Sequence, residues 1–214
     1  LEVQSGAILS SIKNFALKNG RLFPLSLSSE GTCQIGGNLA TNAGGLNVIK
    51  YGNVRDLCLG LEAVLPNGKI LSSMKSLKKN NMGFDLKNLL IGSEGTLGII
   101  TSAILKTFPI PKNPLSVFFS VNNLNDVLVV FEKISELFQD RILAFELIKS
   151  TGINFIKETG FLINNPFKKD TTWMVLMEID VNIGPISLKE ILEQTLYDFI
   201  LSNKIVEVFI ANTL

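Results

Sequence analysis

The hydrophobic residues of the chain fall into runs with two kinds of spacing, and these runs predict both helices and strands. Residues 2–4 have the pattern of a strand end, and residues 7–20 place apolar side chains three and four positions apart, as one face of a helix requires. Gly20 is a favourable stop for that helix, because glycine readily adopts the left-handed conformation that follows a helix C-terminus. The first elements are therefore expected to be a short strand and a helix.

A second pattern, of β-rich runs separated by turn residues, follows in residues 56–108. Asn67 and Gly68 lie between two such runs, and an Asn-Gly pair supplies the positive φ angles of a tight hairpin turn. Residues 86–92 predict a short helix. Residues 97–108 are apolar enough to predict a strand that is buried on both faces.

Three prolines within residues 109–114 end this pattern, since neither a strand nor a helix continues through them. We place a domain boundary here, with one domain over residues 1–112 and a second over residues 113–214. Strand and helix patterns alternate in the second domain, which favours an α+β fold of ferredoxin-like type with helices on one face of a sheet. Ser187 and Glu190 have the spacing of a capping box at the start of the last helix. The expected strands are 115–121, 142–148, 171–179 and 204–211, and the expected helices are 125–139, 150–158 and 187–202.

The overall composition narrows the function classes. The chain has 214 residues and a formal net charge of +1, so neither nucleic acid nor an anionic membrane is the expected main partner. It contains no apolar run of the roughly eighteen residues that a membrane-spanning helix needs. Residues 1–11 lack the basic region of a signal peptide. A cytoplasmic protein without a transmembrane segment is therefore expected.

The cysteine and histidine contents limit the possible chemistry. Cys33 and Cys58 are the only cysteines, which fits a reducing compartment, and each is expected to be a small buried residue. The chain has no histidine, which excludes histidine-based triads, histidine general bases and histidine-containing metal sites within it. No metal site is expected and no catalytic residue is assigned. Chemistry would come from a cofactor, a carboxylate, a lysine or a part of the protein outside this sequence.

Two glycine-rich motifs stand out, and the first covers residues 36–45. It reads GGNLATNAGG, two glycine pairs around six small or polar residues without a charge. Such a run can be a turn that simply needs glycine. It can also be a phosphate-binding loop, because glycines let a ligand approach the backbone. Residues 38–43 are long enough for one helical turn whose free N–H groups would face an anion.

The second motif covers residues 92–101 and reads GSEGTLGIIT, with Gly92, Gly95 and Gly98 at every third position. One interpretation is a bulged entry into a strand. The other is a loop whose backbone and Thr96 border a planar or sugar-phosphate ligand. The motif matches neither the G-x-G-x-x-G dinucleotide fingerprint nor a Walker A loop.

Taken in order, these motifs carry a resemblance to a known family. The stretches PLSLSSEGTCQIGGNLATNAGGLNVIKYGNVRDLCLGLEAVLPNGKIL and LKKNNMGFDLKNLLIGSEGTLGIIT closely resemble the FAD-linked oxidases of the vanillyl-alcohol-oxidase-type superfamily, whose FAD-binding domain is called PCMH-type. Within it they are most similar to D-2-hydroxyglutarate, D-lactate and glycolate dehydrogenases or oxidases. The resemblance is dense over residues 3–111 and looser beyond residue 114.

The resemblance implies that residues 1–112 are the C-terminal part of an FAD-binding domain and that residues 113–214 are an incomplete, ferredoxin-like substrate or cap domain. It implies FAD as the cofactor and oxidation of a D-2-hydroxy acid to the 2-oxo acid, with hydride transfer to the flavin. The implied partners are a small-molecule 2-hydroxy acid and an electron acceptor, and a homodimer is the expected assembly. The implied cofactor-binding residues are Thr32, Cys33, Gly36, Gly37, Asn38, Thr41, Asn42, Ala43, Gly44, Glu94, Gly95, Thr96, Leu97, Gly98, Ile99 and Ile100.

Departures from the family pattern keep other functions open. The family's earlier glycine-rich loop and its later histidine-containing motif are both outside this sequence, and residues 79–86 read KNNMGFDL where close relatives read KDNTGYDL. The chain therefore resembles the middle of a larger flavoenzyme. The alternatives are a truncated, non-catalytic FAD-binding or vestigial module and, within the superfamily, a cell-wall precursor reductase. Arg55 and Asp85 are expected to serve in a salt bridge or a loop cap.

Overall fold

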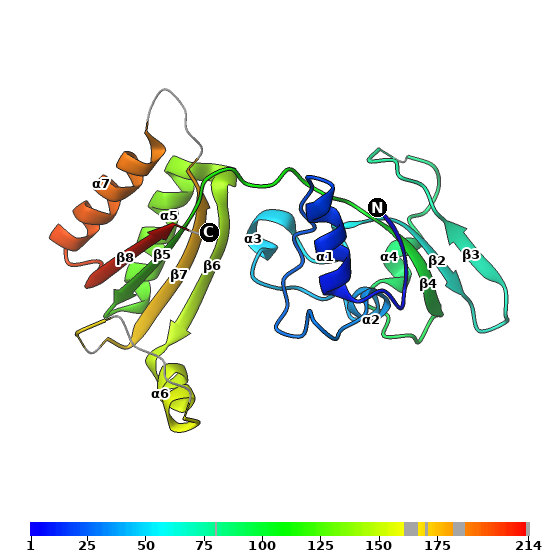
Figure 1. Ribbon diagram of the computed structural model, residues 1–214, viewed down its shortest axis with the longest axis horizontal. Coiled ribbons are helices and arrows are strands. Elements are labelled where there is room, and N and C mark those ends of the chain that lie inside the picture. The colour runs from blue at the N-terminus through cyan, green and yellow to red at the C-terminus, as the bar shows by residue number, and fades with distance from the viewer. Residues whose placement is uncertain (80, 161–166, 170, 182–186, 213–214) are drawn as a thin grey trace. The chain divides into compact units, whose positions relative to one another are not determined.

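The computed structural model describes residues 1–79, 81–160, 167–169, 171–181 and 187–212, and the chain divides into two compact units (Figure 1). The first unit is Leu1–Ile110 and the second is Pro111–Leu214, so the division falls within the proline-rich segment. Over the described ranges, no helix has both the length and the apolar character that crossing a membrane requires.

The first unit is built around a four-stranded antiparallel sheet with the strand order β1-β4-β2-β3. Its elements are β1 (Glu2–Gln4), α1 (Leu9–Lys18), α2 (Ile35–Ala40), α3 (Val48–Tyr51), β2 (Cys58–Val64), β3 (Ile70–Ser73), α4 (Lys87–Leu90) and β4 (Ile99–Leu105). Ala103 of β4 pairs with Val3 of β1 and with Leu61 of β2. Leu9 of α1 and Ile35 of α2 are fully buried in the same core as Leu61. The two helices thus cover the sheet with their apolar faces.

The strand β4 corrects one expectation, because it is not buried on both faces. Ala103 and Leu105 are buried, whereas the side chain of Ile99 is 64% exposed. An antiparallel sheet commonly buries one face only, so alternate residues of its strands point away from the core. Strict alternation would still place Ile99 on the same face as Ala103, four positions away. The register shifts between Glu62 and Ala63, which marks a bulge in β4 that turns Ile99 to the other face.

The predicted hairpin forms between β2 and β3, but its turn differs from a two-residue Asn-Gly turn. The Leu65 amide donates to the Lys69 carbonyl at 2.9 Å, and the Gly68 amide donates to the Leu65 carbonyl at 2.9 Å. Within the pair, Gly68 alone has a positive φ, of +78°. Asn67 acts through its side chain instead, because its Oδ1 accepts from the Lys69 amide at 3.0 Å.

The second unit also holds a four-stranded antiparallel sheet, with the strand order β6-β7-β5-β8. Its elements are β5 (Pro114–Val121), α5 (Leu124–Phe138), the 3-10 helix η1 (Gln139–Arg141), β6 (Ile142–Lys149), α6 (Ser150–Glu158), β7 (Trp173–Asp180), α7 (Leu188–Leu201) and β8 (Glu207–Asn212). Val130 of α5 and Leu192 of α7 are fully buried in one core with Val117 and Val175 of the sheet. Two antiparallel sheets with packed helices confirm the predicted α+β class.

Side-chain caps fix where the two long helices of this unit begin. The Asn123 Oδ1 accepts from the Asn125 amide at 3.0 Å at the start of α5. The Ser187 Oγ accepts from the Glu190 amide at 3.3 Å at the start of α7, which confirms the predicted cap.

Candidate cofactor site

The first glycine-rich motif folds as α2, which begins at Ile35 and not at residue 38 as the sequence suggested. Ile35 and Leu39 are both fully buried, and they lie one helical turn apart. Burial of this apolar pair therefore fixes the start of the helix, upstream of the polar residues that drew attention in the sequence.

The two glycines at the start of α2 have different surroundings. A Cβ atom on Gly36 would lie 2.6 Å from the Cβ of Ser5, so this position excludes larger residues for internal packing reasons. A Cβ atom on Gly37 would meet no atom within 4 Å. Among the described residues, no contact therefore requires a glycine at position 37, and close approach of a ligand would explain one there.

The amides at the start of α2 correct the expected anion-binding turn. The Ile35 amide donates to the Ala7 carbonyl at 2.9 Å, and the Gly36 amide donates to the Ser5 carbonyl at 2.8 Å. The Asn38 amide donates to the Gln34 carbonyl at 3.1 Å. Among the residues that the structure describes, the Gly37 amide alone of this first turn has no acceptor. Loop carbonyls thus take most of the donors that a phosphate would use.

The second glycine-rich motif lies directly against the end of α2. The Gly92 amide donates to the Leu39 carbonyl at 3.0 Å, and the Glu94 amide donates to the Ala40 carbonyl at 2.9 Å. Gly92, Glu94 and Gly95 all have positive φ angles, of 81°, 52° and 78°. This left-handed backbone explains two of the glycines, and it turns the chain past α2 and into β4.

Together the two motifs border a cavity of about 260 Å³, which we call the glycine hollow. None of the side chains that line it carries a charge. Four of its lining residues are glycines, which offer only backbone, and the exposed side chain of Ile99 also lines it. The hollow is lined by Ser5, Gln34, Gly36, Gly37, Ala40, Gly95, Gly98, Ile99 and Ile100.

Six of the residues implied as cofactor-binding line the hollow, namely Gly36, Gly37, Gly95, Gly98, Ile99 and Ile100. The structure also places Ser5, Gln34 and Ala40 there, which the sequence analysis missed. Ala40 lies between two residues that were considered, so extending the first motif along its helix would have included it. Gln34 also lies between implied residues, Cys33 and Gly36, whereas Ser5 has no local signal, because only the packing of β1 against α2 brings it to the site.

The remaining implied residues lie outside the lining of the hollow, and several already have internal partners. The Thr41 Oγ1 donates to the Gly37 carbonyl at 3.0 Å, and the Asn42 Oδ1 accepts from the Arg55 amide at 3.2 Å. A Cβ atom on Gly44 would lie 2.5 Å from the Asn53 Oδ1, so that glycine serves packing. The residues outside the lining are Thr32, Cys33, Asn38, Thr41, Asn42, Ala43, Gly44, Glu94, Thr96 and Leu97.

Asn38 remains notable although it lies outside the lining. It is 6% exposed, and its Oδ1 has no hydrogen-bond partner among the described residues. A buried acceptor without a partner is unusual, because desolvation without a hydrogen bond is costly. Asn38 follows Gly37 directly in the sequence. The acceptor without a partner and the glycine with free space around its Cβ position are therefore neighbours on α2.

These observations fit one segment of FAD. Backbone walls, a glycine open to the outside and an exposed apolar side chain suit close contact with a large, partly planar cofactor. The hollow is smaller than the roughly 300–1,000 Å³ typical of ligand pockets, so it would hold a part of such a molecule.

Comparison with known proteins agrees with this chemistry. A family described as an FAD binding domain matches residues 1–73. The D-2-hydroxyglutarate–pyruvate transhydrogenase of Saccharomyces cerevisiae is 38% identical over 165 residues, which cover 75% of this chain and 33% of that protein. The mitochondrial D-2-hydroxyglutarate dehydrogenase of Bos taurus is 39% identical over 157 residues, which cover 73% of this chain and 29% of that protein.

A longer match and a solved structure extend the comparison. The mitochondrial D-2-hydroxyglutarate dehydrogenase of Rattus norvegicus is 35% identical over 92% of this chain and 37% of its own length. The chain thus spans about a third of the length of the curated relatives it matches. A structure of alkyldihydroxyacetonephosphate synthase shares the fold with a TM-score of 0.69 at 21% identity, covering 99% of this chain and 39% of that one.

The matched FAD binding domain and the identity of 35–39% to these curated relatives lead to one conclusion about the family. FAD is the cofactor of this family. The chain belongs to the flavoproteins with a PCMH-type FAD-binding domain, as the glycine-rich motifs predicted.

Proposed function

We propose that this chain forms part of an FAD-dependent oxidoreductase that oxidises a D-2-hydroxy acid to the 2-oxo acid. The glycine hollow carries the proposal, because it brings the two glycine-rich motifs together in a wall of backbone with an open glycine. The names of the relatives support the substrate class, since they refer to D-2-hydroxyglutarate. Which 2-hydroxy acid reacts is part of the proposal, and D-2-hydroxyglutarate is the first to test.

Residues of the first unit would hold one face of the cofactor. The backbone of Gly36 and Gly37 would lie against it from α2, and that of Gly95 and Gly98 from the second motif. Ile99 would cover an apolar part of the cofactor, because its side chain is 64% exposed at the hollow. FAD, when bound, supplies the two-electron redox chemistry, so this chain's share is to bind, orient and exclude water.

A titration of the 214-residue chain with FAD tests this assignment. The hollow would hold only one segment of the cofactor, so we expect the isolated chain to purify with little flavin and to bind FAD reversibly, with micromolar or weaker affinity. Gly37→Leu should abolish the change in flavin fluorescence that reports binding, because the new side chain would occupy the hollow.

Gly152→Leu is the matched control for this substitution. Gly152 lies in α6 of the second unit, and a Cβ atom there also meets no atom within 4 Å. We expect this variant to bind FAD like the unmodified chain. Equal FAD binding by Gly37→Leu and Gly152→Leu would remove the hollow from the cofactor site.

The alternative of a non-catalytic FAD-binding module has one specific observation in its favour. The chain contains no histidine, so the commonest general base near neutral pH is missing from it. The two functions differ in an anaerobic experiment on the FAD-loaded chain. Loss of the flavin absorbance on adding D-2-hydroxyglutarate supports the oxidoreductase, whereas bound flavin that no D-2-hydroxy acid reduces supports the module.

Three further expectations belong to the same proposal. Oxidation of the hydroxy acid requires an electron acceptor, and a homodimer is the expected assembly. A cytoplasmic location, expected from the sequence, stays a prediction, and the names of the Bos taurus and Rattus norvegicus relatives include the word mitochondrial. Cell fractionation would distinguish the two locations.

A further inference from the structure

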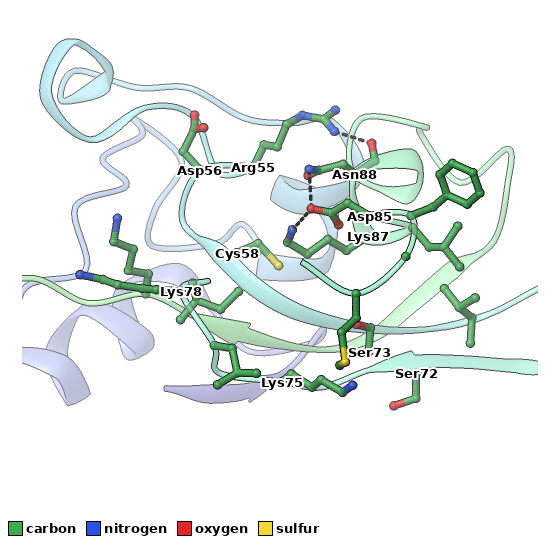
Figure 2. Close-up of a pocket in the computed structure, with 18 residues that line it drawn as sticks. Arg55, Asp56, Cys58, Ser72, Ser73, Lys75, Lys78, Asp85, Lys87 and Asn88 are labelled. Atoms are coloured by element: carbon green, nitrogen blue, oxygen red, sulfur yellow. Dashed lines mark hydrogen bonds and ion pairs between the residues drawn. The ribbon is translucent and has the colours of Figure 1, made fainter. Parts of the chain in front are cut away.

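A second and larger cavity of the first unit, of about 710 Å³, is rich in basic side chains (Figure 2). We call it the basic pocket. Arg55, Lys75, Lys78, Lys87 and Lys106 line it. Asp56 and Asp85 are the carboxylates in its wall, so five cations against two anions give the lining a net formal charge of +3.

Part of this charge is already used within the wall. Lys87 forms an ion pair with Asp85, and the Asp85 Oδ2 also accepts from the Asn88 Nδ2 at 3.0 Å. The Arg55 guanidinium donates to the carbonyls of Asn88 and Ile91. Figure 2 shows these side chains linked by hydrogen bonds. The link confirms the predicted loop-cap and salt-bridge roles of Arg55 and Asp85, and it makes this side of the pocket a fixed wall.

The remaining lysines lack a neutralising partner. Neither Lys75 nor Lys78 has a carboxylate within 4.0 Å among the described residues. Lys106 lies 4.6 Å from the centre of the Phe108 ring, a contact that leaves its charge available to an anion. Three ammonium groups thus border one cavity without an ion-pair partner among the described residues, and the net positive charge of the lining attracts a multivalent anion even though Asp56 lies in the same wall.

The pocket is distinct from the glycine hollow. The two cavities share no lining residue. The hollow meets β4 at Ile99 and Ile100, whereas the pocket meets Lys106 just beyond the other end of the strand and Cys58 at the start of β2. The two cavities therefore meet β4 near its opposite ends and are lined by different residues.

We propose that the basic pocket binds a small organic oxyanion that carries at least two negative charges, such as a phosphate ester or a polycarboxylate. Its volume lies within the range of small-molecule sites, which is more than a bare ion needs. Asn88 adds a further contact, because its buried Oδ1 has no partner among the described residues and could accept from a ligand hydroxyl. Leu77, Met82 and Phe84 supply apolar surface for the carbon part of the molecule.

Calorimetric titration of the 214-residue chain at low ionic strength tests the proposal. Inorganic pyrophosphate and citrate are the two probes, and they distinguish a phosphate ligand from a polycarboxylate. We expect at least one to bind with one-to-one stoichiometry. The double variant Lys75→Gln/Lys78→Gln should bind it about tenfold more weakly, since two charge-assisted contacts are lost. Its melting temperature should stay unchanged, because neither lysine has a structural partner among the described residues.

Lys133→Gln/Lys189→Gln is the matched control, because both lysines are half-exposed on helices of the second unit. This control should bind the probes like the unmodified chain. Three outcomes would overturn the proposal: no binding of either probe, equal weakening in the two double variants, or displacement of the probe by FAD. Binding of polyglutamate but of neither probe would also overturn it, in favour of an acidic protein partner. A failure here leaves FAD binding at the hollow untouched, because the variants change no residue of the hollow.

Discussion

The glycine hollow and the basic pocket lie at opposite ends of β4, and they are built from different parts of the chain. Four of the residues that line the hollow are glycines, and hydrogen bonds hold the segment that begins at Gly92 against α2. Five long basic side chains line the pocket, and Lys75 and Lys78 among them are exposed. A backbone site has little to lose when a side chain is shortened, but it is sensitive to added atoms. A side-chain site behaves in the opposite way.

The largest expected effect tests the backbone construction of the hollow. Gly36→Ala should lower the free energy of unfolding by about 2–3 kcal/mol, because the added Cβ would lie 2.6 Å from that of Ser5. The clash outweighs the gain of roughly 0.5–1 kcal/mol that alanine brings to a helix interior. Urea denaturation measures the change. A stability equal to that of the unmodified chain would mean that β1 and α2 are less tightly packed than the Ser5 contact implies.

The second effect concerns the floor of the basic pocket. Cys58 is 3% exposed, and burial raises the pKa of its thiol to about 11, against a smaller lowering by Lys87 and by a backbone hydrogen bond from Gly60, while Asp85 adds to the rise. The unfolded thiol ionises from about pH 9. Between these values the unfolded chain binds fewer protons than the folded one, so stability falls as pH rises.

Comparison with Cys58→Ala isolates this contribution from other groups that titrate at high pH. The stability difference between the two proteins should shrink by about 2 kcal/mol as pH rises from 9 to about 11. Denaturation at several pH values provides the measurement. A stability difference that does not change with pH would show that water reaches the thiol. Cys58 would then be as solvated as the exposed lysines of the pocket.

The third effect separates the two cavities by their response to salt. A tenfold rise in ionic strength should weaken anion binding at the basic pocket about tenfold, because exposed lysines are screened. FAD binding at the uncharged hollow should change by less than about twofold over the same range. Titrations at two salt concentrations measure both. An equally strong salt dependence of FAD binding would indicate that FAD also reaches the lysines.

The elements were largely predictable from the sequence, whereas the exact ends depended on tertiary contacts. Periodicity and turn residues predicted every strand of the second unit, and the reason is clearest for β5 and β7, whose alternate apolar residues lie in the core. The start of α2 was missed because burial of Ile35 and Leu39, and not the polar run after them, determines it. Asn67 was expected to take a positive φ, but its side chain caps the turn while Gly68 alone supplies that conformation.

The two cavities differ in how far sequence reasoning reached them. The hollow was anticipated through its glycine motifs and their family resemblance, although spacing alone did not join the two motifs. The basic pocket was not anticipated, because Arg55, Lys75 and Lys106 are far apart in the sequence and none lies in either glycine-rich motif. The folding of β2, β3 and the segment before α4 brings them to one cavity. A charge cluster built from distant residues leaves no local signal.

The smallest expected effect separates packing from ligand binding within the hollow itself. Gly37→Ala should raise the free energy of unfolding by about 0.5–1 kcal/mol, because alanine favours a helix and its Cβ meets no atom within 4 Å. The same substitution should weaken FAD binding, since the methyl group would project toward the space assigned to the cofactor. Thermal denaturation without flavin and an FAD titration measure the two effects on one variant.

Higher stability together with unchanged FAD affinity would mean that the cofactor does not approach this glycine. Lower stability would mean that residues near Gly37 already fill the space. Gain of stability with loss of affinity is the combination that a ligand-facing glycine predicts, whereas Gly36→Ala, whose added Cβ would meet Ser5, should lose stability.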